Sequence, residues 1–238
     1  MQPTYPHMTL TSIPMMGHLL GLPLFDGLDG AALERIAAGA SEVNAHRGTL
    51  IFRRGDACRG LHIVINGQVT LALQGAQGNE RIVELVGPGG TFGETAIFLD
   101  RPHLFTASTL ADTRLAQVSK ATVLAELERT PRFTRALIES LSRRLRYLVG
   151  ALEDCMLRSG TERVMGYLLS RVPPEAVNGN AVVTLSTKKS IIASQLNLTH
   201  EHFSRILREL FMAGLIEVDG RNVHIASVSQ LRARAGGA

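Results

Sequence analysis

The stretch NLTHEHFSRILREL, residues 197–210, combines an apolar face with a row of polar side chains. Phe203, Ile206 and Leu207 recur at helical spacing, so one side of a helix can pack on a core. The opposite side then faces solvent and is available to a partner. Its polar row consists of His200, Glu201, Ser204, Arg205 and Arg208.

The residues before this stretch predict a second helix and a sharp turn. A short helix is expected from about Lys188 to Leu196, and a second from Thr199 to Met212. Asn197 lies between them and tolerates the left-handed conformation that such a turn requires. Thr199 can cap the second helix. The two helices form a helix-turn-helix if they share a small core. The residues expected in that core are Ile192, Leu196, Phe203 and Leu207.

The segment LIEVDGRNVHIA, residues 215–226, predicts a β-hairpin after the second helix. Asp219 and Gly220 form a turn signal between two alternating apolar strands. A further helix is expected over 162–171. Residues 160–238 therefore predict a winged helix-turn-helix.

Residues 49–118 show short alternating apolar segments that are separated by glycines. Val69, Leu71 and Leu73 alternate with polar or small residues, and Gly67 and Gly89 fall where tight turns are needed. This pattern predicts a small antiparallel β-roll or jelly roll over 19–130, and the fold class is α+β. Residues 1–18 are predicted to be a flexible N-terminal arm.

A long helix is predicted over 131–159, where Pro131 can occupy the first turn. Its apolar stripe has steps of four, four, three, four and four residues, which is typical of a seam between two parallel copies. Burial against the β-roll of the same chain is the alternative. The residues of the stripe are Leu137, Leu141, Leu145, Leu148, Leu152 and Met156.

Composition excludes several classes of protein. The 238 residues are 45% hydrophobic, as in an ordinary globular chain, and carry a formal net charge of +4. Residues 161–238 hold nine Lys or Arg against six acidic residues, so most of the positive charge lies there. Cys58 and Cys155 are the only cysteines, which argues against a disulfide framework, a structural zinc site or an iron–sulfur cluster. No metal site is expected. The chain shows no signal peptide or membrane-spanning run, so we expect a cytoplasmic protein without a membrane partner.

These elements in this order resemble the CRP/FNR superfamily of bacterial transcription regulators over roughly residues 19–230. The resemblance implies a homodimer that binds double-stranded DNA, contacts RNA polymerase and is not an enzyme. A hydrolase is disfavoured because the sequence has neither a Gly-x-Ser-x-Gly elbow nor a phosphate-binding glycine loop. The motifs that carry the resemblance are RRGD (53–56), INGQVTL (65–71), GPGGTFGE (87–94) and THEHFSRILREL (199–210).

The polar row matches the Glu-x-x-Ser-Arg pattern of the FNR branch through Glu201, Ser204 and Arg205. Glutamate can accept a hydrogen bond from cytosine N4, and arginine can bind guanine bidentately. The resemblance implies a palindrome with TTGAT-like half-sites. The residues expected to contact the DNA backbone are Lys188, Lys189, Thr199, His200, Arg208 and Arg221.

The resemblance also bears on cyclic AMP. Gly93 and Glu94 match the Gly-Glu pair that holds the nucleotide in CRP, but His103 stands where CRP has its phosphate-binding arginine. Leu104 follows where CRP has serine. We therefore expect Gly93 and Glu94 to be structural residues and cyclic AMP not to be the effector. An effector pocket, if present, is expected at Gly93, Glu94, His103, Leu148 and Val149, the last two replacing a Thr-Ser pair.

The absence of certain residues limits which signal the sensor domain can recognise. The cysteine cluster of FNR proper is absent, which leaves a resemblance to the cysteine-poor, DNR-like relatives that respond to nitric oxide or low oxygen, some through haem. Haem or a lipid-like effector would suit an apolar pocket beside Leu148 and Leu152. A cyclic-nucleotide-responsive regulator or binding module is the alternative. The histidines of the sensor half are His7, His18, His46, His62 and His103.

Overall fold

The computed structural model describes residues 8–11, 15–74, 80–176 and 179–236. The chain forms two compact units, and the boundary between them lies between Leu145 and Arg146. Among the described helices, none combines the length and apolar character that crossing a membrane requires.

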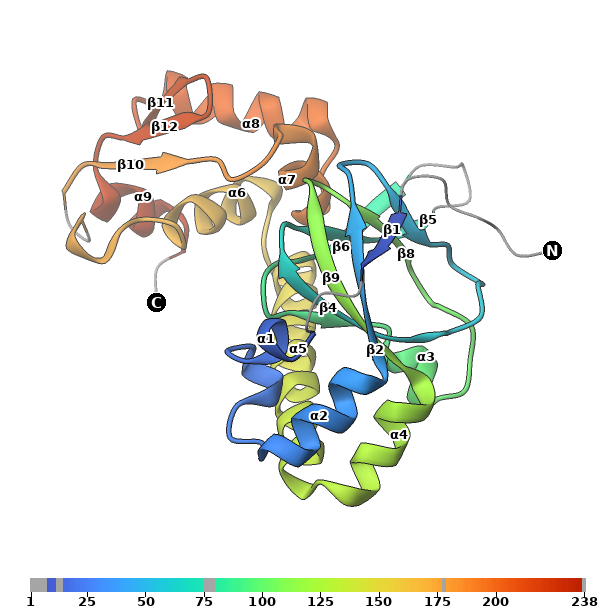
Figure 1. The fold of residues 1–238 in the computed structure, drawn as a ribbon. Helices are drawn as coiled ribbons and strands as arrows, with labels where there is room; N and C mark the ends of the chain where they lie inside the picture. Colours follow the sequence, from blue (N-terminus) through green and yellow to red (C-terminus); the bar gives the residue numbers. More distant parts are fainter. Residues whose placement is uncertain (1–7, 12–14, 75–79, 177–178, 237–238) are drawn as a thin grey trace. The chain divides into compact units, whose positions relative to one another are not determined.

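The first unit contains two antiparallel sheets, which confirms the predicted β-roll (Figure 1). The first sheet has the order β1 (Met8–Thr11), β2 (Ala40–Ala45), β9 (Thr113–Ser119), β4 (Gly60–Asn66) and β7 (Thr91–Phe92). The second has the order β3 (Leu50–Phe52), β8 (Thr106–Thr109), β5 (Val69–Gln74) and β6 (Glu80–Val86).

Strands β4 and β9 are buried on both faces. Because successive side chains of a strand point to opposite sides, each of these strands contributes residues to two different cores. Val64 and Leu115 pack into a core with residues of the second sheet. Leu61, Ile63 and Val118 belong to a different core, which the first sheet shares with the helices. The unit therefore has three layers, formed by two sheets and a group of helices.

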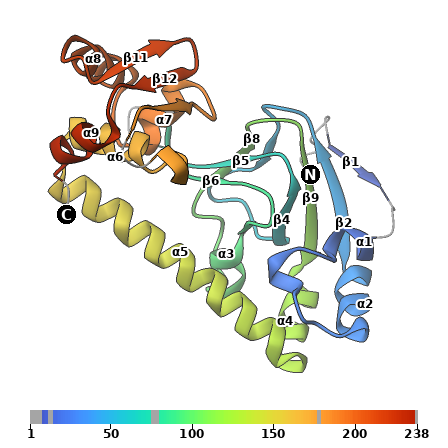
Figure 2. The ribbon, with the colours of Figure 1, turned by 90° about the vertical axis from the view of Figure 1, so that its left-hand side faces the viewer.

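The helical layer is formed by segments that are far apart in the sequence. Phe25 and Phe133 stack there with ring centroids 6.2 Å apart. Figures 1 and 2 show the helices α1, α2 and α4 grouped near the start of α5. The helices of this unit are α1 (Met15–Leu19), α2 (Gly30–Ala38), α3 (Glu94–Phe98), α4 (Lys120–Arg129) and the first part of α5 (Pro131–Leu157), with a short 3-10 helix at Pro23–Phe25. The rest of α5, from Arg146, belongs to the second unit.

The segment predicted as an arm contains ordered elements. β1 pairs with β2, and α1 buries Met15 and Leu19 in the helical core. Burial of these two apolar side chains fixes the chain before residue 19. Residues 1–7, which include His7, and residues 12–14 lie outside the described residues.

The apolar stripe of α5 is divided between two environments. Leu137 is buried in the core of the first unit beside Phe133, so its assignment to a dimer seam is wrong. Leu145 and Leu152 are 64% and 59% exposed, and Met156 is also exposed. Leu141 and Leu148 are half-buried. The stripe beyond Leu137 therefore lacks a full partner within the described chain.

The second unit surrounds a single hydrophobic core with helices and a small antiparallel sheet. The sheet has the order β10-β12-β11, so the predicted hairpin β11–β12 gains a third strand. Its elements after α5 are α6 (Gly160–Leu169), a 3-10 helix at Pro174–Ala176, β10 (Ala181–Thr184), α7 (Lys189–Gln195), α8 (His200–Met212), β11 (Ile216–Asp219), β12 (Asn222–Ile225) and α9 (Val228–Arg234).

Candidate nucleic-acid interface and effector region

Helices α7 and α8 form the predicted helix-turn-helix. Asn197 has φ of +53°, the left-handed conformation expected at the turn, and Leu198 N donates to Ala193 O at 2.8 Å. Ile192, Phe203 and Leu207 are buried in the shared core. This packing fixes the side of α8 that faces solvent.

Helix α8 begins with a side-chain N-cap and has an acidic residue in its first turn. Thr199 Oγ1 accepts a hydrogen bond from His202 N at 3.2 Å, which confirms the predicted cap. The pKa of Glu201 is lowered, first by its own backbone amide and then by the Thr199 hydroxyl. The exposed carboxylate is therefore charged at neutral pH and can accept a hydrogen bond from a base edge.

Arg205 lies one turn further along the same exposed side. Its Nε is 3.8 Å from Glu209 Oε1, and its side chain is 67% exposed. An exposed ion pair of this kind contributes little stability, so the guanidinium can exchange it for a guanine edge. Ser204 is half-buried between Glu201 and Arg205 in sequence. The three predicted base-reading residues thus lie on the first half of α8.

The basic residues around this helix differ in their surroundings. Lys188, His200 and Arg208 are exposed, and Lys189 is half-buried. Arg221 instead donates from Nε and Nη2 to Leu185 O at 3.0 and 2.8 Å. Two of its three nitrogens thus hold the hairpin to the segment after β10, a structural role that the sequence did not indicate.

The Gly-Glu pair of the first unit is joined to α5 by an arginine. Gly93 has φ of +103° and precedes α3, whose first residue, Glu94, is buried. Arg144 Nη1 lies 3.1 Å from Glu94 Oε2, and its Nη2 lies 2.8 Å from Glu84 Oε2. Burial raises the pKa of Glu84, which Arg144 opposes. The sequence analysis missed Glu84 and Arg144, because only the fold brings their segments together.

His103 lies in an aromatic cluster beside this pair. Its ring stacks on Phe52 with centroids 3.6 Å apart, and His62 stacks on Phe92 with centroids 4.9 Å apart. His103 N donates to Asp56 O at 2.9 Å, so its loop is held from both backbone and side chain. Burial lowers the pKa of His103 and lowers that of His62 to about 3. Both rings are therefore neutral packing groups at physiological pH.

The buried His62 predicts a loss of stability in acid. The unfolded chain takes up a proton on His62 near pH 6.5, whereas the folded protein does so only near pH 3. Above pH 6.5 the residue contributes no pH dependence. Below it, the free energy of unfolding should fall by about 1.4 kcal/mol per pH unit, or about 2 to 3 kcal/mol by pH 4.5.

Urea unfolding of the wild type and of His62→Phe at pH 7.5 and 4.5 measures the contribution of His62 to the pH dependence of the free energy of unfolding. The phenylalanine variant should lose less stability between the two pH values, while His46→Phe at an exposed site should behave as wild type. An equal loss in His62→Phe and wild type would contradict the assignment.

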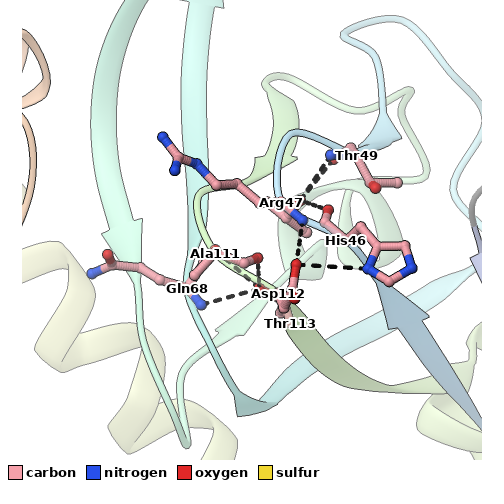
Figure 3. Close-up of polar contacts among 8 residues, drawn as sticks. His46, Arg47, Thr49, Gln68, Ala111, Asp112 and Thr113 are labelled. Carbon is pink, nitrogen blue, oxygen red and sulfur yellow. Dashed lines mark hydrogen bonds and ion pairs between the residues drawn. The ribbon is translucent and has the colours of Figure 1, made fainter.

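The other described histidines of the first unit lie apart from this cluster. His18 Nε2 is 3.3 Å from the buried Glu42 carboxylate. His46 lies at a turn, where its Nδ1 is 3.7 Å from Asp112 Oδ1 and Arg47 N donates to the same oxygen at 2.8 Å (Figure 3). Its side chain is 82% exposed.

The remaining predicted pocket residues and the cysteines are distributed over both units. Leu148 is half-buried and Val149 exposed, and both belong to the second unit. Cys58 is half-buried in the first unit, and Cys155 is exposed in the second. Burial raises the pKa of the Cys58 thiol, so it is not an activated nucleophile.

Comparison with known families accounts for both units. A model of the cyclic nucleotide-binding domain matches residues 42–130, and a model of the Crp-like helix-turn-helix domain matches residues 162–234. The chain belongs to the CRP/FNR family of transcription regulators. This CRP/FNR regulator thus binds DNA through its helix-turn-helix and is not an enzyme.

Known proteins similar to this CRP/FNR regulator span most of its length. The CRP-like cAMP-activated global transcriptional regulator of Mycobacterium tuberculosis is 26% identical over 214 residues, 89% of this chain and 96% of the relative. The c-di-GMP responsive global regulator CLP of Xanthomonas campestris has the same fold, with a TM-score of 0.71 and 23% identity over 83% of this chain and 99% of CLP. DNR from Pseudomonas aeruginosa is 29% identical over 91% of this chain and 96% of its own, but its TM-score of 0.48 carries no argument for a DNR-like subtype.

Proposed function

We propose that this regulator reads an FNR-like palindrome with TTGAT-like half-sites as a homodimer. The observation that carries the proposal is the exposed first half of α8, where Glu201, Ser204 and Arg205 follow a capped helix start. The N-terminal residues of a recognition helix are those that reach base edges in the major groove. Lys188, Lys189, Thr199, His200 and Arg208 flank these residues as phosphate contacts, with Arg221 contributing through its remaining nitrogen.

Arg205→Ala is expected to weaken binding by about 1 to 3 kcal/mol and to relax the preference at the guanine, because it removes a bidentate contact. Lys188→Ala should weaken binding to all sequences similarly, because a phosphate contact carries no sequence information. Selection from random DNA, followed by affinity measurements with single-base variants, separates the two effects.

The wild type should select a palindrome in this experiment, and Arg205→Ala should select one that is degenerate at the guanine. Arg232→Ala is a matched control for loss of one exposed arginine away from α8. A wild-type selection without a palindrome, or an unchanged preference in Arg205→Ala, would contradict the proposed role of α8.

Dimerisation supplies the second half-site. CRP-family regulators typically dimerise, and α5 offers a continuous apolar stripe for it. Ile138, Leu145 and Leu152 recur every seven residues and are exposed. A parallel pairing of two α5 helices would cover this stripe and place two recognition helices for successive major grooves about 34 Å apart. We infer that the sensor domain acts by shifting the balance between two arrangements of the paired helices.

We infer that the signal is not cyclic AMP. Glu94 is already paired with Arg144, and His103 is stacked on Phe52 where CRP carries its phosphate-binding arginine. The name of the M. tuberculosis relative favours the alternative, a cyclic-nucleotide-responsive regulator. No step of the proposed mechanism depends on haem.

A further inference from the structure

We propose that the second unit contains a binding site for a small phosphate ester of nucleotide size, formed by arginines of α5 and α6. The site is a cavity of about 560 Å³ between the last turns of α5, the helix α6 and the end of α7. Cavities of roughly 300 to 1,000 Å³ are typical of small-molecule sites. This cavity is separate from the base-reading residues of α8 and from Gly93 and Glu94.

The charge of the cavity favours an anion. Its lining includes four arginines and two acidic residues, and one acid, Asp154, is 3.2 Å from Arg158. Arg146 has no hydrogen bond or ion pair with any described residue. Arginine presents planar pairs of donors that match the oxygens of a phosphate. The four arginines are Arg146, Arg158, Arg163 and Arg171.

Three of the four arginines, Arg158, Arg163 and Arg171, are held in place by groups of the second unit. The guanidinium carbon of Arg171 lies 3.7 Å from the centre of the Tyr167 ring, and its Nη1 donates to Ser170 Oγ at 3.1 Å. Arg163 donates from Nε to Leu196 O at 2.9 Å. Gly166 leaves room for Arg158, because a side chain there would place its Cβ 3.3 Å from Arg158 Nη1. Fixed guanidinium groups lose little conformational freedom when an anion binds.

Tyr167 carries an unpaired hydroxyl beside the cavity. The residue lines the cavity and is only 8% exposed, yet its hydroxyl is buried without a hydrogen-bond partner among the described residues. Buried hydroxyls are nearly always paired, because leaving one unpaired costs about 1 to 3 kcal/mol. A phosphate oxygen would supply the missing partner if the Tyr167 ring shifts to bring its hydroxyl to the cavity surface.

The size and the apolar walls favour a nucleotide over a free phosphate ion. Gly150, Ala151 and Leu196 line the cavity together with Tyr147, whose side chain is half exposed. A planar base can pack on such a surface while the phosphate meets the arginines. An inorganic phosphate ion would leave this apolar surface uncovered.

The exposed stripe of α5 borders this site. Gly150 and Asp154 are two residues beyond Leu148 and Leu152, so they point about 160° away around the helix, whereas Ala151 and Cys155 lie about 60° from the same leucines. A second copy packed on the stripe would therefore approach one edge of the cavity and leave the side at Gly150 and Asp154 open.

Calorimetric titration of the full chain without DNA tests the site with 5′-AMP, 5′-GMP and inorganic phosphate as separate probes. At least one nucleotide should bind with a Kd below about 1 mM and at least about tenfold more tightly than inorganic phosphate. Binding of neither nucleotide, or binding no tighter than inorganic phosphate, would overturn the proposal. Because DNA is absent, this result is independent of the proposed palindrome.

Three variants and one control test whether the heat of nucleotide binding comes from this cavity. Arg146→Gln and Arg171→Gln should each weaken nucleotide binding about tenfold or more, and Tyr167→Phe should weaken it while leaving the thermal stability equal or higher. Arg232→Gln removes the same charge from α9 and should bind within about twofold of wild type. Equal weakening by Arg232→Gln, or unchanged binding in Tyr167→Phe, would show that the cavity is not the site.

Discussion

Glutamate at both Leu145 and Leu152 is expected to convert the protein to a monomer and to abolish specific DNA binding. The two residues are seven apart on α5 and are 64% and 59% exposed, so they face the same direction. In a symmetric pair each meets its own copy, and the double variant would bury four like charges at one interface. Each uncompensated buried charge costs several kcal/mol, so dimer affinity should fall by at least about a thousandfold.

Sedimentation velocity at micromolar concentration measures this change. Because both leucines are exposed in the single chain, the monomer should keep its circular dichroism and unfold cooperatively. Arg143→Glu, on the opposite side of α5 from Leu145, is the control and should remain a dimer. An unchanged dimer in the double variant would place the dimer contact elsewhere.

Cyclic AMP is expected not to bind at micromolar concentration, and DNA affinity should be the same with and without it. The resemblance to CRP implies that His103, whose ring is held against Phe52, stands where CRP has its phosphate-binding arginine. It likewise implies that Leu148 and Val149 stand where CRP has hydroxyl groups that meet the base. Each missing contact to a charged or buried polar group costs about 1 to 3 kcal/mol, and two or three of them amount to roughly 4 to 6 kcal/mol, or at least a thousandfold.

Arg101 provides the control for this prediction, because it is exposed and lies two residues before His103. Calorimetry with cyclic AMP should give no micromolar binding in the wild type or in Arg101→Ala. Micromolar binding that Arg101→Ala abolishes would show that Arg101 reaches the phosphate, and the cyclic-nucleotide alternative would then replace ours.

The elements that were predicted from the sequence are those whose signals are local. Asn197, Thr199 and the Asp219-Gly220 turn each act on the backbone within a few residues, and α7, α8, β11 and β12 lie where these residues indicate. β10 was missed because four alternating residues define a strand only through their pairing with β12, some forty residues later. The short helix α3 has no side-chain cap, whereas α2 and α4 were missed although Asp29 and Ser119 cap them locally.

Side chains of α5 illustrate the same limit within one helix. Leu137 and Leu145 both belong to the apolar stripe that the sequence predicts, but they lie about 80° apart around the helix, and only Leu137 meets the helical core of the first unit. The ion pairs of Arg144 with Glu84 and Glu94 join residues 50 or more positions apart. The periodicity of a sequence identifies which face of a helix is apolar. Which other element packs on each turn of that face depends on the tertiary fold.

In the proposed dimer, the continuity of α5 would make self-association and signal recognition reciprocal. Phe133 and Leu137 belong to the core of the sensor, and the stripe that begins to be exposed at Ile138 continues on the same unbroken helix. A torsion of 20° about the axis of that helix displaces the tips of its side chains sideways by about 2 Å, enough to change how two stripes mesh. If a signal alters dimer affinity by some factor, dimer formation must alter affinity for the signal by the same factor. The apparent threshold for the signal should then vary with the cellular abundance of the regulator itself.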